Sequence, residues 1–109
     1  MLTGLIFALS LTTTSGECSG VGRQEILSGN IVLGFETSYI SVIKGKYRGQ
    51  KIWIEEANKL EAELVRKSSS AKGAWKRANG IISGCVAGGR FGHLGLYKFK
   101  VSKIDIALN

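Results

Sequence analysis

The sequence predicts a mainly β protein, a small five-stranded barrel with one α-helix between the third and fourth strands. Three observations support this fold class. Apolar and polar residues alternate with a period of two over several short segments. One internal segment changes to helical spacing. The chain also holds 15 glycines and no proline, a composition typical of coiled, bulged strands and tight loops rather than of a flexible linker.

Composition places the chain among folded proteins and favours anionic partners. Of its 109 residues, 44% are hydrophobic and 21% are charged, which argues against disorder and leaves room for one domain. The formal net charge of +7 favours nucleic acid, acidic glycan or lipid headgroups as partners. The same charge can simply keep a small secreted protein soluble, so both interpretations stay open.

The first 16 residues have the composition of a secretory signal peptide. An uncharged apolar run, Met1–Leu11, precedes small polar residues that end at Gly16. This run is shorter than the roughly 20 residues of a membrane-spanning helix. No basic residue precedes it, which leaves a buried first strand, or a start codon assigned too far downstream, as the alternatives. We expect cleavage near Gly16, a single domain over 17–109 without a transmembrane segment, and a periplasmic or secreted location.

The expected mature chain keeps two cysteines, an even number that suits an oxidising compartment. A disulfide between Cys18 and Cys85 would close a long loop and contribute about 4 kcal/mol in the chain-entropy model. Two unpaired thiols are the alternative. Lipidation of Cys18 is disfavoured because Glu17 stands where lipoprotein signals carry a small residue. The sequence has no Cys-x-x-Cys motif or Cys/His cluster, so we expect no metal site and no cofactor.

Three strands are expected in the first half of this domain. Two of them lie within Glu25–Ile43, where apolar residues alternate through Ile31–Phe35 and again through Tyr39–Ile43. A basic, glycine-marked turn, Lys44–Lys51, follows them. Ile52–Ile54 is then a short third strand.

Helical spacing begins at Glu55 and continues to Lys67. Ala57, Leu60 and Leu64 fall on one face, and acid–base pairs four residues apart support an amphipathic helix of about three turns. This apolar stripe is expected to pack in the core. A polar loop over 68–73 ends the helix.

The last third of the chain holds two more strands around a glycine-rich loop. The fourth strand covers Ile81–Ala87, and the segment Gly88–Leu96 follows with four glycines in its first eight residues. Alternation resumes at Tyr97 and shifts phase once near Ser102–Lys103, as a β-bulge or a barrel corner would require.

Three strands, a helix and two strands form the element order of the OB-fold, a partly open barrel. OB-folds bind ligands on the face of strands two and three, and through the loops between strands one and two and between strands four and five. The glycine-rich segment is the second of these loops. The candidate ligand-binding residues are Arg90, Phe91 and His93 in that loop, Tyr39 and Trp53 on the strands, and Lys44, Lys46, Arg48 and Lys51 in the basic turn.

Three segments carry a further signal: Gly34-Phe35-Glu36, the tryptophan strand Ile52–Ile54, and Arg90–Tyr97 with its Gly-His-Leu-Gly-x-Tyr pattern. Together they resemble a family of small uncharacterised exported bacterial proteins, over most of the chain after Gly29. The chain is also loosely similar to the bacterial OB-fold family of periplasmic proteins. The resemblance implies an OB-like barrel in the cell envelope and no established activity.

His93 is the side chain whose ordinary pKa lies nearest to neutral pH. Catalysis would need a nucleophile, a carboxylate or a metal beside it, and Glu36 could approach only through the fold. A role in tying the loop together through hydrogen bonds to the backbone is the simpler explanation. The spacing Gly89-x-x-Gly92-x-x-Gly95 is no dinucleotide fingerprint, because a strand follows it. We expect positive φ at Gly92, at Gly95 or at both.

The sequence therefore predicts a non-catalytic, exported binding module of the cell envelope with an anionic or protein partner. A single-stranded nucleic-acid-binding OB domain is the alternative, because aromatic and basic residues share the candidate face. Export and the tendency of Trp53 and Phe99 to join the core weigh against it. An envelope hydrolase ranks third, since the sequence shows no carboxylate cluster for calcium.

Overall fold

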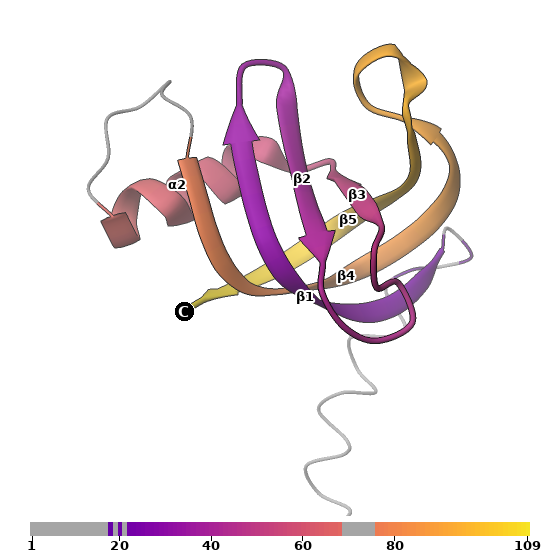
Figure 1. Cartoon of the computed structure of the whole chain (residues 1–109), viewed down its shortest axis with the longest axis horizontal. Helices are drawn as coiled ribbons and strands as arrows, with labels where there is room; N and C mark the ends of the chain where they lie inside the picture. The colour runs from indigo at the N-terminus through magenta and orange to yellow at the C-terminus, as the bar shows by residue number, and fades with distance from the viewer. Residues whose placement is uncertain (1–17, 19, 21, 69–75) are drawn as a thin grey trace, which may run out of the picture.

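The structure, a computed structural model, describes residues 18, 20, 22–68 and 76–109. Its elements are β1 (Arg23–Gly34), β2 (Thr37–Val42), β3 (Lys51–Ile54), α2 (Ala57–Ser68), β4 (Lys76–Phe91), a short 3₁₀ helix η2 (His93–Gly95) and β5 (Tyr97–Leu108). The five strands close into a barrel in the order β1-β2-β3-β5-β4, with α2 between β3 and β4 in the chain (Figure 1). The predicted OB-like barrel is confirmed.

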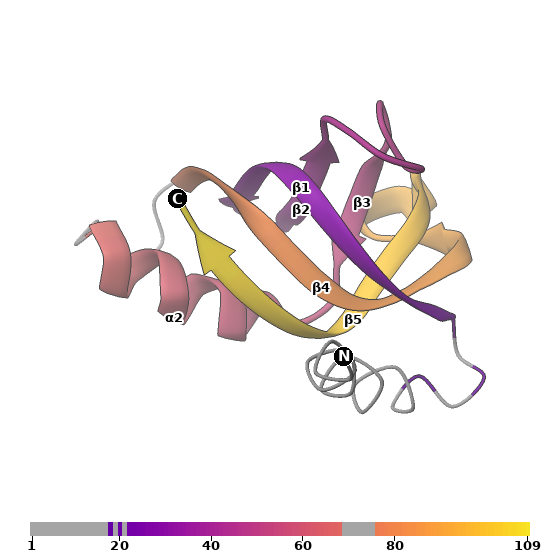
Figure 2. The ribbon, with the colours of Figure 1, turned by 90° about the horizontal axis from the view of Figure 1, so that it is seen from below.

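The barrel is held together by one parallel and four antiparallel strand pairs. β1 pairs with both β2 and β4, β2 with β3, and β4 with β5, all antiparallel, whereas β3 and β5 run parallel. Figure 2 shows the long strands β1, β4 and β5 curving side by side. Glycine allows a close approach inside this curve, because a Cβ atom on Gly84 would stand 2.6 Å from the carbonyl oxygen of Ser102.

Aliphatic side chains from every strand and from α2 fill the interior. The core comprises Leu27, Ile31, Leu33, Ile40, Val42, Ile52, Ile54, Leu60, Leu64, Ile82, Val86, Val101 and Ile104. Leu60 and Leu64 come from α2, and Ala57 packs against the cluster. The apolar stripe of the helix is therefore core, as its spacing predicts.

The register of β5 against β4 shifts between Ser83 and Cys85, because β5 carries one extra residue there. The bulge contains Lys103, whose φ is 52°. The carboxylate of Glu56 accepts hydrogen bonds from the backbone N–H groups of Lys103, at 2.9 Å, and Ile104, at 3.2 Å. The expected phase shift is thus a β-bulge, held by the residue that precedes α2.

Cys18 and Cys85 form a disulfide, with their Cα atoms 5.5 Å apart. Both side chains are buried. The bond ties the segment before β1 to β4, two regions separated by 67 residues in sequence. The predicted pairing is confirmed.

Some boundaries differ from the sequence expectation. Strand β4 begins at Lys76 and ends at Phe91, so it extends beyond both ends of the predicted fourth strand, and α2 begins at Ala57 instead of Glu55. Phe35 lies in the β1–β2 turn instead of closing a strand. The expected signal peptide over 1–16, and residues 69–73 of the expected polar loop, lie outside the described residues. Within the described ranges, no helix is long and apolar enough to span a membrane.

Candidate ligand-binding face

The outer face of the sheet carries two rows of side chains that run from β4 across β1 and β2 to β3. Residues opposite one another in paired strands project on the same side of the sheet. The pairing aligns Arg77, Val32, Tyr39 and Trp53 in one row, and Asn79, Asn30, Ser41 and Lys51 in the next. The neighbours of Val32 along β1, Ile31 and Leu33, belong to the core, which places both rows outside the barrel.

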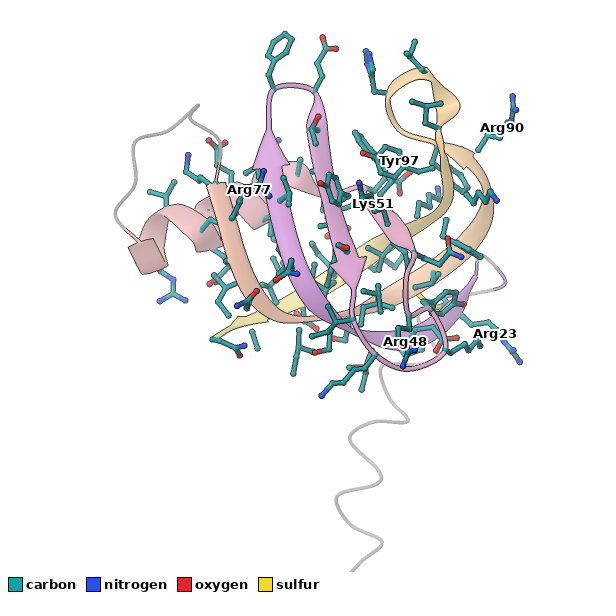
Figure 3. All side chains as sticks on the ribbon, in the orientation of Figure 1. Arg23, Arg48, Lys51, Arg77, Arg90 and Tyr97 are labelled. Atoms are coloured by element: carbon teal, nitrogen blue, oxygen red, sulfur yellow. A yellow bond between two sulfur atoms is a disulfide. The ribbon has the colours of Figure 1, made fainter. Side chains whose placement is uncertain are left out.

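These rows line an open hollow of about 410 Å³. We call it the polar hollow and define it by Asn30, Val32, Tyr39, Ser41, Lys51, Arg77, Ala78 and Asn79. Arg77 belongs to β4 and Lys51 to β3, so β1 and β2 lie between the two cations (Figure 3). Neither cation forms an ion pair with an acidic side chain among the described residues. Both charges are therefore available to an anion.

An aromatic cluster borders the hollow on the side of β3. The ring centroid of Tyr97 lies 5.2 Å from that of Trp53 and 5.9 Å from that of Tyr39. Burial in this cluster raises the pKa of the Tyr97 hydroxyl above its ordinary value of 10.0, and the neighbouring Tyr39 adds to the increase. The cluster therefore favours a neutral Tyr97, which can donate a hydrogen bond beside the hollow.

Groups of the protein itself cover the faces of several rings. The ammonium of Lys51 lies 5.3 Å from the centroid of Tyr39, and that of Lys100 lies 5.1 Å from the centroid of Phe91. The backbone at Gly92 approaches Trp53 so closely that a Cβ atom there would stand 2.6 Å from the indole. Stacking surface for a base is correspondingly reduced on this face.

The β1–β2 turn and the β4–β5 loop meet through His93. Its Nδ1 atom lies 3.2 Å from Oε1 of Glu36, and both side chains are more than half exposed. The histidine side chain thus contacts a carboxylate of the other loop. The backbone carbonyl of His93 does accept a hydrogen bond, from the N–H of Leu96 at 3.3 Å.

The structure brings some predicted site residues together and separates others. Tyr39, Trp53 and Lys51 lie on the outer face, and Arg90, Phe91 and His93 lie at the nearby β4–β5 loop and the end of β4. Lys44, Lys46 and Arg48 lie in the β2–β3 turn, at the opposite end of β2 from the β1–β2 turn (Figures 1 and 3). Lys46 is engaged by Glu25 at 2.9 Å, a hydrogen bond that raises the lysine pKa. The basic turn is therefore a separate surface.

Sequence reasoning missed Arg77, Asn79, Asn30 and Ser41. The signal for the first two was the polar alternation at 77 and 79, which becomes visible once the fourth strand is extended back to Lys76. For the other two it was the matching alternation of outward residues on β1 and β2. That these four residues share one surface can be recognised only when the pairing of the strands is known.

Among the described residues, no group of three or more His, Cys, Asp or Glu side chains is placed to hold a metal ion. Comparison of the chain with protein-family models, with curated proteins and with solved structures gives no match.

Proposed function

We propose that this protein is a non-catalytic binding module of the bacterial cell envelope, and that its polar hollow holds an acidic, hydroxyl-rich chain such as an acidic oligosaccharide. The observation that carries the proposal is the pair of cations Lys51 and Arg77, which have no acidic partner among the described residues and lie on either side of a hollow lined with amides and hydroxyls. Cations of this kind bind carboxylate or phosphate. Asparagine and serine side chains donate to and accept from sugar hydroxyls.

The architecture of the hollow supports a binding role rather than a catalytic one. Paired strands fix both rows of the hollow, so a ligand would meet a preorganised surface. His93 and Glu36 lie at an exposed loop contact, and neither lines the hollow. An envelope hydrolase accordingly has less support than a binding module.

The disulfide supports the envelope location. Bonds such as Cys18–Cys85 form and persist in oxidising compartments, and they are rare in the cytosol. An exported protein would meet acidic envelope glycans before it met nucleic acid. Compartment and surface chemistry thus favour the same ligand class.

A single-stranded nucleic acid is the second candidate, because the same cations would contact phosphates and Tyr39 lies between them. Stacking on aromatic rings supplies much of the affinity in that mode. The rings here are covered by Lys51, by Lys100 and by the backbone at Gly92. This coverage favours the oligosaccharide.

The test is a calorimetric titration of the protein with three probes: a hexamer of galacturonic acid, a neutral hexamer of glucose, and a decamer of thymidylate. We expect binding of the acidic hexamer and none of the neutral one. Lys51→Gln combined with Arg77→Gln should weaken binding by about tenfold or more, as expected for lost charge-assisted hydrogen bonds.

The matched control is Lys44→Gln combined with Arg48→Gln, which removes the same charge from the β2–β3 turn. It should change the affinity by less than about twofold if the hollow is the site. Equal losses in the two double variants would show that net charge alone attracts the hexamer. Submicromolar thymidylate binding that survives at about 0.15 M salt would instead promote the nucleic-acid hypothesis.

A further inference from the structure

Three exposed apolar side chains stand on the paired loops at one edge of the barrel. Phe35 is 77% exposed, Leu94 78% and Leu96 72%. We call these three residues the apolar tip. The β1–β2 turn and the β4–β5 loop that carry them project from the same edge of the molecule (Figure 1), and the contact between Glu36 and His93 joins the two loops.

Each of the two loops contains a residue other than glycine with a positive φ angle. Leu94 has φ 59° and ψ 16°, and Glu36 has φ 50°. This left-handed conformation is costly for any residue with a Cβ, and glycine or asparagine adopts it more readily. The loop is closed by the N–H of Gly95, which donates to the carbonyl of Gly92 at 3.0 Å. The leucine is therefore held outward by a defined turn.

Cations without a described acidic partner lie next to the tip. Arg90 points away from the barrel beside the β4–β5 loop (Figure 3), and Lys98 is exposed at the start of β5. Neither pairs with an acidic side chain among the described residues. The carboxylate of Glu36, next to Phe35, lies 3.2 Å from Nδ1 of His93. Two cations beside this one carboxylate give the surroundings of the tip a net positive charge, which complements an anionic surface.

We infer that the apolar tip inserts into the surface of an anionic membrane. Three side chains offer an area on the order of a few hundred Å², below the roughly 800 Å² that each partner of a stable protein complex buries. Side chains that project from loops with cations beside them suit a lipid interface, where the apolar groups enter the acyl boundary and the cations meet headgroup phosphates. None of the three lines the polar hollow, so this surface is independent of the proposed ligand site.

The experiment measures cosedimentation of the full chain with sucrose-loaded vesicles, made of phosphatidylcholine alone or with about a third phosphatidylglycerol. We expect the parent to partition about tenfold more strongly onto the anionic vesicles, as for other interfacial contacts that combine apolar and basic groups. Phe35→Ser combined with Leu94→Asn should reduce that partitioning about tenfold. Asparagine is chosen because it tolerates the backbone conformation at 94. All variants share one N-terminus, so the differences report on the tip.

The matched control is Ile26→Thr, which removes an apolar side chain that is 66% exposed near the opposite end of β1. It should change partitioning by less than about twofold. Leu96→Trp provides a second measurement: its added fluorescence should shift to the blue when anionic vesicles are supplied. Circular dichroism and urea denaturation verify that each variant is folded.

Equal partitioning of the parent and the double variant, or a Leu96→Trp spectrum that vesicles leave unchanged, would overturn the inference. So would a parent dimer in sedimentation velocity that the double variant converts to a monomer, because the tip would then be a contact between two copies of the chain.

Discussion

Gly92 lies against the indole of Trp53, where a Cβ atom would stand 2.6 Å from Cε3 of the ring. The same atom would stand 2.7 Å from Cδ1 of Tyr97. This contact seats the β4–β5 loop on the aromatic cluster beside the polar hollow. Both Gly92 and Gly95 have positive φ, 77° and 63°, so the expectation for this loop is confirmed.

Gly92→Ala should lower the free energy of unfolding by about 2 kcal/mol or more, from roughly 1 kcal/mol for positive φ and a further 1–3 for overpacking against the rings. Gly95→Ala is the control, because its Cβ atom would meet only the Cβ of Arg90, at 3.8 Å. It should cost about 1 kcal/mol, from backbone conformation alone. Urea denaturation measures both, and equal losses would mean that the contact with Trp53 contributes nothing.

Alternation predicted most strands because their inward residues are aliphatic, as in Ile52–Ile54 and in the segment after Tyr97. It failed over the first part of β4, where the inward positions hold Lys76, which is 4% exposed, and the small Ala78. A lysine and an alanine at the inward positions do not produce the alternation of large apolar and polar residues from which a strand is predicted. Pairing with β1 imposes the strand there regardless of local propensity.

The candidate site was predictable only in part, because nearness in sequence differs from nearness in space. Lys44 and Lys51 belong to one basic segment, yet Lys44 lies in the β2–β3 turn and Lys51 lies on β3 in the polar hollow. Arg77 lines the same hollow from β4, and the strands β1 and β2 separate β4 from β3 on this face. The contact of His93 with Glu36 joins two loops that only the closed barrel brings together.

Glu56→Ala should destabilise the protein by roughly 1.5–3 kcal/mol, the usual range for hydrogen bonds to a charged group. The carboxylate holds the backbone N–H groups of Lys103 and Ile104 at the β-bulge, and no side chain replaces it in the variant. Glu55→Ala removes the neighbouring carboxylate, which pairs with Lys100 in a partly exposed ion pair. That control should cost at most about 1 kcal/mol. Thermal unfolding separates the two, and a loss as small for Glu56 as for Glu55 would contradict the bulge-holding role.

Reduction of the Cys18–Cys85 bond should lower stability by about 4 kcal/mol in the chain-entropy model, because the bond closes a loop with a sequence separation of 67. The native exported protein should resist thiol alkylation until it is reduced. Mass spectrometry after alkylation, with and without reductant, measures this directly. Labelling of both cysteines in the unreduced protein would show that the bond does not form in the cell.

Above pH 10 the ionisation of Tyr97 should erode stability, because burial beside Trp53 and Tyr39 raises the pKa of its hydroxyl in the folded state. The folded chain keeps the proton at pH values where the unfolded chain has lost it. The contribution is therefore complete below the unfolded pKa of about 10 and is lost as the pH rises through the folded value. Lys46, whose pKa is also raised, titrates in the same range.

Tyr97→Phe isolates the tyrosine, since Lys46 remains in place and phenylalanine carries no proton to lose. Urea denaturation between pH 9 and 11 should give a shallower decline for this variant than for the parent. The difference in phenolate absorbance between the two proteins should yield a midpoint above 10.0 for Tyr97 itself. Identical declines in the two proteins would mean that the hydroxyl of Tyr97 is as solvated in the aromatic cluster as in the unfolded chain. The cluster would then exclude less water from the edge of the polar hollow than its ring contacts imply.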